Sequence, residues 1–264
     1  MTESQPSCHT LAVLAHSSAE YDSFYHLVLE SPGWAWTPGQ FVMLRAQNWT
    51  CDPFSPRPFS IADLDTHALH LRYQVVGKAT RQMAALQPKD KVTVWGPLGS
   101  GFSYDHDVPT LLLAGGMGIV PFVGLVHAHP RTQNLELLFG HRNELHNYPY
   151  QEIAEKILVW NLQDRTPKDL NKLNKALQVK IEGYSRDGMI LACGPLPFLR
   201  VVQELAVHNK ARCQISLETT MVCGVGACLG CIIKTKSGEQ RQACMHGPVF
   251  SADELVLPGE EPGA

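Results

Sequence analysis

The sequence predicts a multidomain chain with an N-terminal antiparallel β-barrel, a middle parallel α/β sheet and a small C-terminal domain. Three observations lead to this fold class. Short apolar runs divided by turn residues fill the first hundred positions, strand–glycine–helix units follow, and four of the eight cysteines lie close together after residue 220. These changes of pattern place the domains at residues 1–104, 105–211 and 212–264.

Composition excludes several classes of protein. Hydrophobic residues make up 44% and charged residues 18% of the 264 positions, which is enough to build a core and argues against disorder. Lys plus Arg number 22 against 25 for Asp plus Glu, so a nucleic-acid binder is not expected. Residues 110–129 contain no Lys, Arg, Asp or Glu but include Gly115, Gly116, Gly118 and Pro121, which favours a buried strand running into a helix over a membrane span. With no secretory signal visible at the start, we expect a soluble, cytoplasmic protein without membrane contact.

The predicted barrel contains six strands and one helix. Regular short spacing, with Gly and Pro between the runs, is typical of a small antiparallel barrel. Met83 and Leu86 recur at helical spacing and predict a helix over residues 80–86. The strands are expected at residues 10–16, 24–29, 41–45, 59–62, 68–76 and 92–95.

The middle region alternates buried strands with helices, which is the pattern of a Rossmann-like parallel sheet. Buried strands are expected at residues 110–114, 135–139, 157–159 and 189–193. Helices are expected at residues 119–127, 150–155, 168–177 and 198–208.

The clustered cysteines have the spacing C-x4-C-x2-C, then twelve residues, then C: Cys223, Cys228, Cys231 and Cys244. This is the plant-type 2Fe–2S spacing. Gly224, Gly226 and Gly230 would let the backbone turn so that three thiolates converge, and their amides can bond the sulfurs. Structural zinc is the alternative, although zinc sites usually show two short Cys pairs. Cys8, Cys51 and Cys213 are expected to be free thiols.

Two motifs in the barrel suit a phosphate-bearing cofactor. Arg57, ahead of the strand Pro58-Phe59-Ser60, can pair bidentately with a pyrophosphate, and Ser60 would face an isoalloxazine edge. Residues 73–80 read as a strand entering a helix, with Gly77 at the turn and Thr80 as N-cap. An ordinary Arg-Pro turn and an ordinary capped helix would give the same letters.

Two glycine-containing turns follow strands of the middle region. Gly115, Gly116 and Gly118 lie between a strand and a helix, where a nucleotide phosphate can approach the backbone. Cys193-Gly194-Pro195 ends another strand at the carboxyl edge of the sheet, where open α/β sheets bind ligands. Cys193 could equally be a small buried residue.

Taken together, R-P-F-S, G-x-x-T, Gly96-Pro97-Leu98-Gly99, the triple-glycine turn and Cys193-Gly194-Pro195 resemble the ferredoxin–NADP reductase superfamily. With the C-terminal cysteines and Cys244-Met-His-Gly-Pro-Val-Phe, the chain resembles the electron-transfer subunits of NAD-dependent, two-subunit dihydroorotate dehydrogenases. The resemblance covers nearly the whole chain, and the cysteine motif is its most specific part.

The resemblance implies FAD in the barrel, a 2Fe–2S cluster on the four cysteines and NAD(H) at the middle domain, with Cys193 beside the nicotinamide. The FAD contacts would be Arg57, Pro58, Phe59, Ser60, Arg72, Tyr73, Gln74, Gly77, Ala79 and Thr80. The family commonly has Arg where Gln74 stands and Gly where Ala79 stands, so these two contacts depart from its pattern. Arg142 could favour NADP through a 2′-phosphate, whereas the family favours NAD.

These features predict an electron-transfer subunit without a side-chain catalyst of its own. Hydride carries two electrons and a 2Fe–2S cluster accepts one, so a flavin is needed between them. The implied partner is an FMN-containing subunit that oxidises dihydroorotate in pyrimidine synthesis, within a 2+2 heterotetramer. The alternatives are a related subunit of a sulfhydrogenase, sulfite reductase or transhydrogenase, and a redox-sensing module. Transhydrogenase subunits of this family have Asp at the first cluster position, and Cys223 counts against them.

Overall fold

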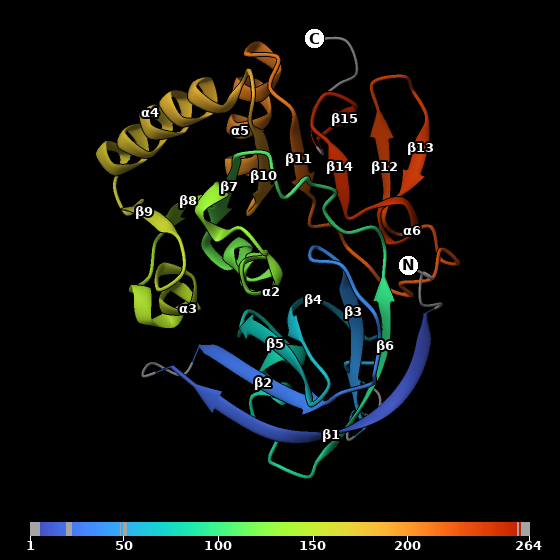
Figure 1. The fold of residues 1–264 in the computed structure, drawn as a ribbon. Coiled ribbons are helices and arrows are strands. Elements are labelled where there is room, and N and C mark those ends of the chain that lie inside the picture. Colours follow the sequence, from blue (N-terminus) through green and yellow to red (C-terminus); the bar gives the residue numbers. More distant parts are fainter. Residues whose placement is uncertain (1–5, 20–22, 48, 50–51, 258, 260–264) are drawn as a thin grey trace.

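The computed structural model describes residues 6–19, 23–47, 49, 52–257 and 259. Three parts follow one another along the chain: a barrel, an α/β layer and a C-terminal lobe beside both (Figure 1). In the described part of the chain, no helix combines the length and the apolar character that crossing a membrane requires.

The N-terminal barrel is closed, with strand order β1-β2-β5-β4-β3-β6. Its strands are β1 (Ser7–Ser18), β2 (Phe24–Glu30), β3 (Phe41–Ala46), β4 (Arg57–Leu64), β5 (Ala68–Gln74) and β6 (Lys91–Leu98). Alternation sets the faces: on β6, Val92 and Val94 are fully buried in the barrel core, whereas Thr93 and Trp95 are partly exposed. The six predicted strands are therefore confirmed.

The barrel helix α1 (Lys78–Met83) begins two residues earlier than predicted. Gly77, in extended conformation, is its N-cap, so the prediction that Thr80 caps the helix is wrong. Thr80 is instead the third helical residue, and its Oγ1 accepts hydrogen bonds from the amides of Gly77 (3.1 Å) and Val76 (3.0 Å). The side chain thus supports the turn from inside the helix, and Leu86 lies beyond the helix end.

The middle part is a six-stranded sheet with the order β14-β11-β10-β7-β8-β9. Its strands are β7 (Thr110–Gly115), β8 (Leu135–His141), β9 (Leu158–Gln163), β10 (Met189–Cys193), β11 (Cys213–Ser216) and β14 (Val249–Ser251). All pairs are parallel except β11–β14. The predicted parallel α/β sheet is confirmed, and the fully buried β7 lies at its centre.

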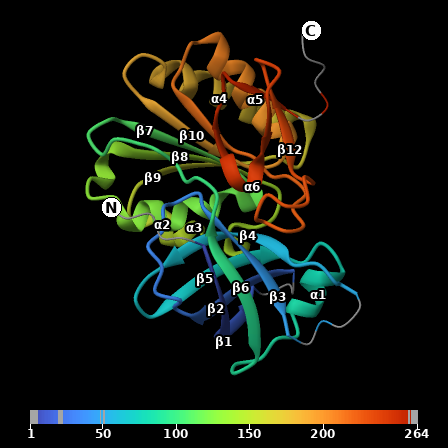
Figure 2. The same cartoon turned by 90° about the vertical axis from the view of Figure 1, so that its right-hand side faces the viewer.

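Helices cover both faces of this sheet. They are α2 (Pro121–Ala128), α3 (Tyr150–Ala154), α4 (Pro167–Tyr184) and α5 (Leu196–His208), with the short 3₁₀ turns η1 (Gly116–Ile119), η2 (Thr132–Asn134) and η3 (Leu145–Asn147). The helices α2 and α3 lie between the sheet and the barrel, whereas α4 and α5 lie on the far side (Figures 1 and 2). The position of α2 therefore determines how the barrel meets the sheet.

Two expectations for this sheet need correction. The strand β9 is an exposed edge and not a buried strand: Leu158 is 59% and Trp160 50% exposed, because β9 pairs with β8 on one side only. The sheet also continues past residue 211, since Ile190 of β10 pairs with Cys213 of β11. The division into three domains at residues 104 and 211 remains a prediction, with β11 and β14 completing the middle sheet.

The C-terminal lobe holds the three-stranded sheet β13-β12-β15 and the helix α6. These elements span β12 (Ile232–Thr235), β13 (Gln240–Gln242), α6 (Ala243–His246) and β15 (Leu255–Val256). One hydrophobic cluster joins this lobe to the sheet and to Met43 and Leu98 of the barrel. This cluster therefore packs the three parts against one another.

Candidate functional site

A cleft of about 530 Å³ opens where the barrel, the carboxyl edge of the sheet and the segment after β11 meet. Most of the predicted cofactor contacts line it. The lining residues are Phe41, Arg57, Pro58, Phe59, Ser60, Arg72, Tyr73, Gln74, Val76, Gly77, Lys78, Ala79, Thr80, Met117, Val120, Cys193, Ser216, Leu217, Glu218, Thr219, Met221 and Pro248. The structure thus brings the R-P-F-S strand, the residues of β5 and the start of α1 into one cavity.

Arg57 lies at the start of β4 with its guanidinium held by the preceding turn. Its Nη1 donates to the carbonyl oxygens of Ser55 (2.8 Å) and Pro56 (3.0 Å) and to Ser55 Oγ (2.9 Å). A guanidinium fixed in this way presents a planar, permanently charged donor to the cleft, as a pyrophosphate requires.

Tyr73 forms an aromatic wall of the cleft together with its neighbours. Its ring stacks on Tyr25 (centroids 5.4 Å apart) and meets Phe59 edge-on (5.8 Å). His16 Nδ1 lies 2.9 Å from the Leu86 carbonyl, which can only accept, so the neutral ring accepts the Tyr73 hydroxyl proton at Nε2 (2.9 Å). Burial lowers the pKa of His16 and raises the pKa of Tyr73, so both remain uncharged at neutral pH.

Cations stand at two further places in the cleft. Arg72 of β5 forms an ion pair with Glu152 of α3, which ties the barrel to the α/β layer. Lys78, at the start of α1, pairs with Asp52. Lys78 therefore lines the same cleft as Gln74 and Ala79, the two positions where the chain departs from the family pattern.

The glycines of the two sheet-edge turns have different surroundings. A Cβ on Gly118 would lie 2.1 Å from the Cys193 carbonyl oxygen, and one on Gly194 would lie 3.0 Å from Gly115. These glycines let the turns after β7 and β10 touch. Gly116 alone among them has a left-handed backbone (φ +52°) with open space beside it. Neither these glycines nor Pro195 line the cleft itself.

Sequence reasoning missed most of the residues that the segment after β11 brings to the cleft. Ser216, Thr219 and Met221 line it, and the Thr219 hydroxyl is buried without a partner among the described residues. Because β11 runs parallel to β10, its carboxyl end lies beside Cys193. The rule that parallel strands place ligand sites at their carboxyl ends would have found these residues once β11 was recognised.

Glu218, for which the sequence left a capping and a solvated role open, opens onto the same cleft. Burial by the surrounding protein raises the pKa of the Glu218 carboxyl. Burial, and then the Glu218 charge, raise the pKa of the Cys193 thiol to about 12. Cys193 is therefore a neutral thiol with 3% exposure, and it faces the cleft without nucleophilic character.

The cysteine loop turns through three left-handed residues, and only two of them are among the three glycines that were expected to let the backbone turn. Gly224 (φ +72°) and Gly226 (φ +75°) have positive φ, and the third such residue is Leu229 (φ +58°) instead of Gly230. A leucine in this region is strained, which is common at functional sites. The two glycines curve the loop so that its amides face the sulfurs.

The four cysteine side chains form two pairs. The Cys223 side chain interacts with that of Cys228. Burial acts to raise the pKa of the Cys223 thiol, but hydrogen bonds from the loop amides and from Cys228 lower this pKa to about 7. The Val225 amide lies 3.5 Å from Cys223 Sγ. In the second pair, the Cys244 amide lies 3.5 Å from Cys231 Sγ, and burial together with Cys231 raises the Cys244 pKa to about 12.

This donor set fits a binuclear iron–sulfur cluster, in which two irons each take two cysteines. Within the residues that the structure describes, no three His, Cys, Asp or Glu side chains gather as ligands of a single metal ion. Free thiols at Cys8 and Cys213 are as expected, and Cys51 lies outside the described residues. Amide-to-sulfur hydrogen bonds of the kind observed here raise the reduction potential of such clusters.

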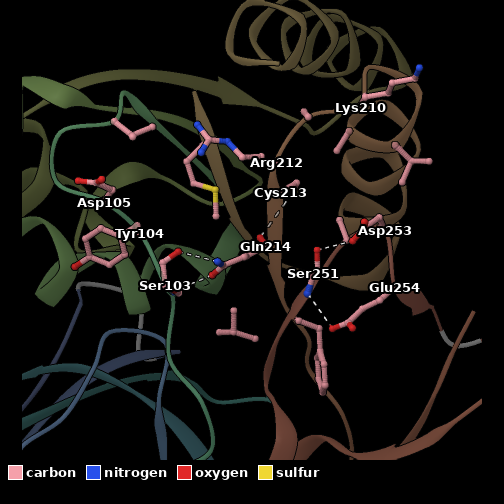
Figure 3. Close-up of a pocket in the computed structure, with 18 of the residues that line it drawn as sticks. Ser103, Tyr104, Asp105, Lys210, Arg212, Cys213, Gln214, Ser251, Asp253 and Glu254 are labelled. Atoms are coloured by element: carbon pink, nitrogen blue, oxygen red, sulfur yellow. Dashed lines mark hydrogen bonds between the residues drawn. The ribbon is translucent and has the colours of Figure 1, made fainter. Parts of the chain in front are cut away.

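A larger cavity of about 930 Å³ lies at the opposite, amino-terminal edge of the sheet (Figure 3). Several of its polar side chains form hydrogen bonds with neighbouring backbone or side-chain groups. Gln214 exchanges two hydrogen bonds with the backbone of Ser103, and Ser251 bonds Asp253 and Glu254. Gln214, Ser251, Asp253 and Glu254 therefore have hydrogen-bond partners within the protein.

Comparison with known proteins identifies the C-terminal lobe. Residues 218–256 match the iron–sulfur cluster binding domain of dihydroorotate dehydrogenase B. Among solved structures, the chain is similar to an NADH-dependent reduced ferredoxin-NADP oxidoreductase (TM-score 0.79, 22% identity, 94% of this chain and 90% of that one). It is also similar to the ferredoxin reductase of carbazole 1,9a-dioxygenase (TM-score 0.65, 17% identity, 77% and 66% covered). These likenesses show a ferredoxin reductase fold.

Curated relatives extend the match to most of the chain. The electron transfer subunit of dihydroorotate dehydrogenase B (NAD(+)) from Caldanaerobacter subterraneus subsp. tengcongensis is 31% identical over 236 residues, 88% of this chain and 92% of that protein. The corresponding subunit of Clostridium acetobutylicum is 32% identical over 228 residues, 83% and 86%. The chain therefore belongs to the family of dihydroorotate dehydrogenase B electron transfer subunits.

Proposed function

We propose that this chain transfers electrons between NAD(H) and an FMN-containing catalytic subunit that oxidises dihydroorotate to orotate in pyrimidine synthesis, within a cytoplasmic 2+2 heterotetramer. One observation supports this most strongly: the cofactor cleft and the cysteine loop share one wall of the barrel. Phe41 of β3 lines the cleft, and Met43 of the same strand contacts the loop at Gly224.

The residues of the cleft suit FAD. Arg57 would hold the pyrophosphate, Phe59 and Tyr73 would flank the ring system, and the Gly77 turn would accept the phosphate side of the cofactor. Bound FAD would supply the conversion between two-electron hydride transfer and one-electron steps. The neutral Cys193 thiol and the buried Thr219 hydroxyl would shape the nicotinamide side and exclude water.

The sheet edge suits NAD more than NADP. Gly116 has open space beside its backbone, where a nucleotide phosphate can approach. Arg142, the cation that would have to receive a 2′-phosphate, lies 3.4 Å from Asp164 and is already paired. This pairing supports NAD(H) as the co-substrate.

The surface around the cysteine loop suits a protein partner. Val222 (44%), Val225 (52%), Leu229 (57%) and Met245 (51%) are exposed together on the loop and on α6. Apolar side chains exposed in one patch are typical of protein–protein contacts. The proposal therefore places the catalytic subunit on this surface, close to the cluster.

The alternatives are distinguished by purification and by turnover. The unmutated chain should contain one FAD and one 2Fe–2S cluster, reduce a soluble dye rapidly with NADH, and co-purify with an FMN-containing dihydroorotate dehydrogenase identified by mass spectrometry. Zinc without acid-labile sulfide, or FMN in place of FAD, would contradict the cofactor assignment. Sulfite reductase or hydrogenase subunits as the co-purifying partner would indicate another complex, and bound cofactors without dye reduction would indicate a redox sensor.

A further inference from the structure

Trp95 is a barrel residue that reaches into the cysteine loop. On β6 its side chain alternates with Val92 and Val94, which point into the barrel, so Trp95 lies on the outer face. Its indole Nε1 donates a hydrogen bond of 3.1 Å to the carbonyl oxygen of Cys223, 128 residues further along the chain. This bond links the barrel directly to the backbone of the first cysteine of the cluster motif.

The loop is packed closely against the barrel at this contact. A Cβ on Gly224 would lie 2.4 Å from Met43 Cγ and 3.0 Å from Leu98 Cδ1, so the loop backbone lies directly on β3 and β6. Phe41, two residues before Met43 on β3, lines the cofactor cleft. The distance between cleft and loop is therefore set across a single wall of the barrel.

A second side chain holds the loop from within the C-terminal lobe. Gln242 Nε2 donates to the Gly226 carbonyl at 2.7 Å, and Gln242 precedes Cys244 by two residues. The loop is thus held at two carbonyls, by Trp95 from the barrel and by Gln242 from the lobe. Between them lies the Val225 amide, which bonds Cys223 Sγ.

We propose that Trp95 is a positioning residue that fixes the first cysteine of the cluster loop against the barrel and so sets the separation of cluster and flavin cleft. The inference rests on the proposed function, in which the cysteines hold a cluster and the cleft holds the flavin. The indole N–H is the one polar donor of tryptophan. Without it, the Cys223 carbonyl loses its barrel partner, and the loop amides loosen around the sulfur.

The test compares three variants of the holoprotein. Trp95→Phe removes the donor, and Trp95→His restores a ring N–H at the corresponding Nε2 position. Trp36→Phe is the matched control, because Trp36 Nε1 also donates to a backbone carbonyl of the barrel at 3.1 Å, that of Leu64, away from the loop. The readouts are the rate of cluster loss to an iron chelator, the midpoint potential and EPR spectrum of the reduced cluster, and NADH–dye reduction.

Trp95→Phe should lose its cluster about two- to tenfold faster, the range expected for one hydrogen bond. Its cluster midpoint should move to a more negative potential, because amide-to-sulfur bonds weaken. Dye reduction by Trp95→Phe should stay unchanged. The rate of cluster loss and the midpoint potential of Trp95→His should lie closer to those of the unmutated protein. Trp36→Phe should have the same cluster properties as the unmutated protein.

Unchanged cluster loss, potential and EPR spectrum in Trp95→Phe would overturn the inference while leaving the proposed function intact. Equal effects in the Phe and His variants would also overturn it, since ring packing and not the hydrogen bond would then matter. Failure of the proposed function is seen separately, as the absence of iron and acid-labile sulfide from the unmutated protein.

Discussion

At the scale of single residues, Arg57 is the side chain on which flavin affinity should depend most. A charge-assisted hydrogen bond contributes about 1.5–3 kcal/mol, so Arg57→Ala should weaken flavin binding by about ten- to a hundredfold and leave the iron content unchanged. Arg45→Ala is the control, because Arg45 also bonds backbone carbonyls in the barrel but does not line the cleft. Flavin occupancy after dilution and gel filtration measures the effect, and equal occupancy in both variants would mean that Arg57 only shapes its turn.

His26 should make stability depend on pH. Burial, and then the charge of the cross-strand neighbour Arg72, lower the pKa of His26 from 6.5 to about 3. Between these values the unfolded chain binds a proton that the folded chain excludes, so stability decreases as the pH falls from about 6.5 toward 3, by at most about 1.4 kcal/mol per pH unit.

His26→Gln removes this group and should therefore show a shallower loss of Tm between pH 7 and pH 5 than the unmutated protein. The exposed His67 provides the control, and His67→Gln should follow the unmutated curve. Parallel Tm curves for all three proteins would show that His26 is protonated in the folded state as readily as in the unfolded state.

At the scale of elements, α2 determines how the barrel meets the sheet. A Cβ on Gly124 of α2 would lie 2.5 Å from Trp36 Cη2 and 2.9 Å from the Ala62 carbonyl oxygen, both in the barrel. Gly124→Ala should therefore lower stability by about 1–3 kcal/mol and slow NADH–dye reduction, with the cluster retained. Gly183→Ala in α4 meets nothing within 4 Å and should be neutral or stabilising by up to about 1 kcal/mol. Thermal unfolding and dye kinetics test the pair, and equal behaviour would mean that α2 shifts without consequence.

The elements themselves were largely predictable, and the errors have physical causes. Short apolar runs divided by turn residues predicted the six barrel strands, and the continuous apolar run at β7 predicted a buried strand of the sheet. The apolar residues of β9 predict a buried strand because they do not reveal that it lies at the sheet edge, where Trp160 donates to Glu136 and Lys180 lies over the Trp160 ring. The strands β11 and β14 were not predicted, because three or four residues show too little periodicity to indicate a strand. Only their long-range pairing with other strands defines them.

At the scale of the whole molecule, the candidate site is assembled from three parts of the chain. Sequence motifs predicted the barrel residues and the cysteines, because turns and ligand spacing are local. Thr219 and Trp95 could not be predicted, since their roles arise where the C-terminal lobe meets the sheet and the barrel. The shared core of the three parts explains how one short lobe can hold the cysteines against the flavin barrel.

The central claim is that the cleft and the cysteine loop act in series, and Cys231→Ser tests it. Cys231 is 3% exposed and pairs with Cys244, so serine, a poorer ligand, should weaken or empty the cluster site. Cys8→Ser is the control, because Cys8 is an exposed thiol of β1 outside the cysteine motif. Gel filtration with the catalytic subunit must show that each variant still forms the complex.

The decisive measurement is the rate of NADH-dependent orotate reduction by that complex, compared with the rate of NADH–dye reduction by the same preparation. The expected result for Cys231→Ser is loss of orotate reduction with dye reduction retained, while Cys8→Ser keeps both. Orotate reduction at the unmutated rate by a Cys231→Ser complex shown to lack the cluster would contradict the series arrangement.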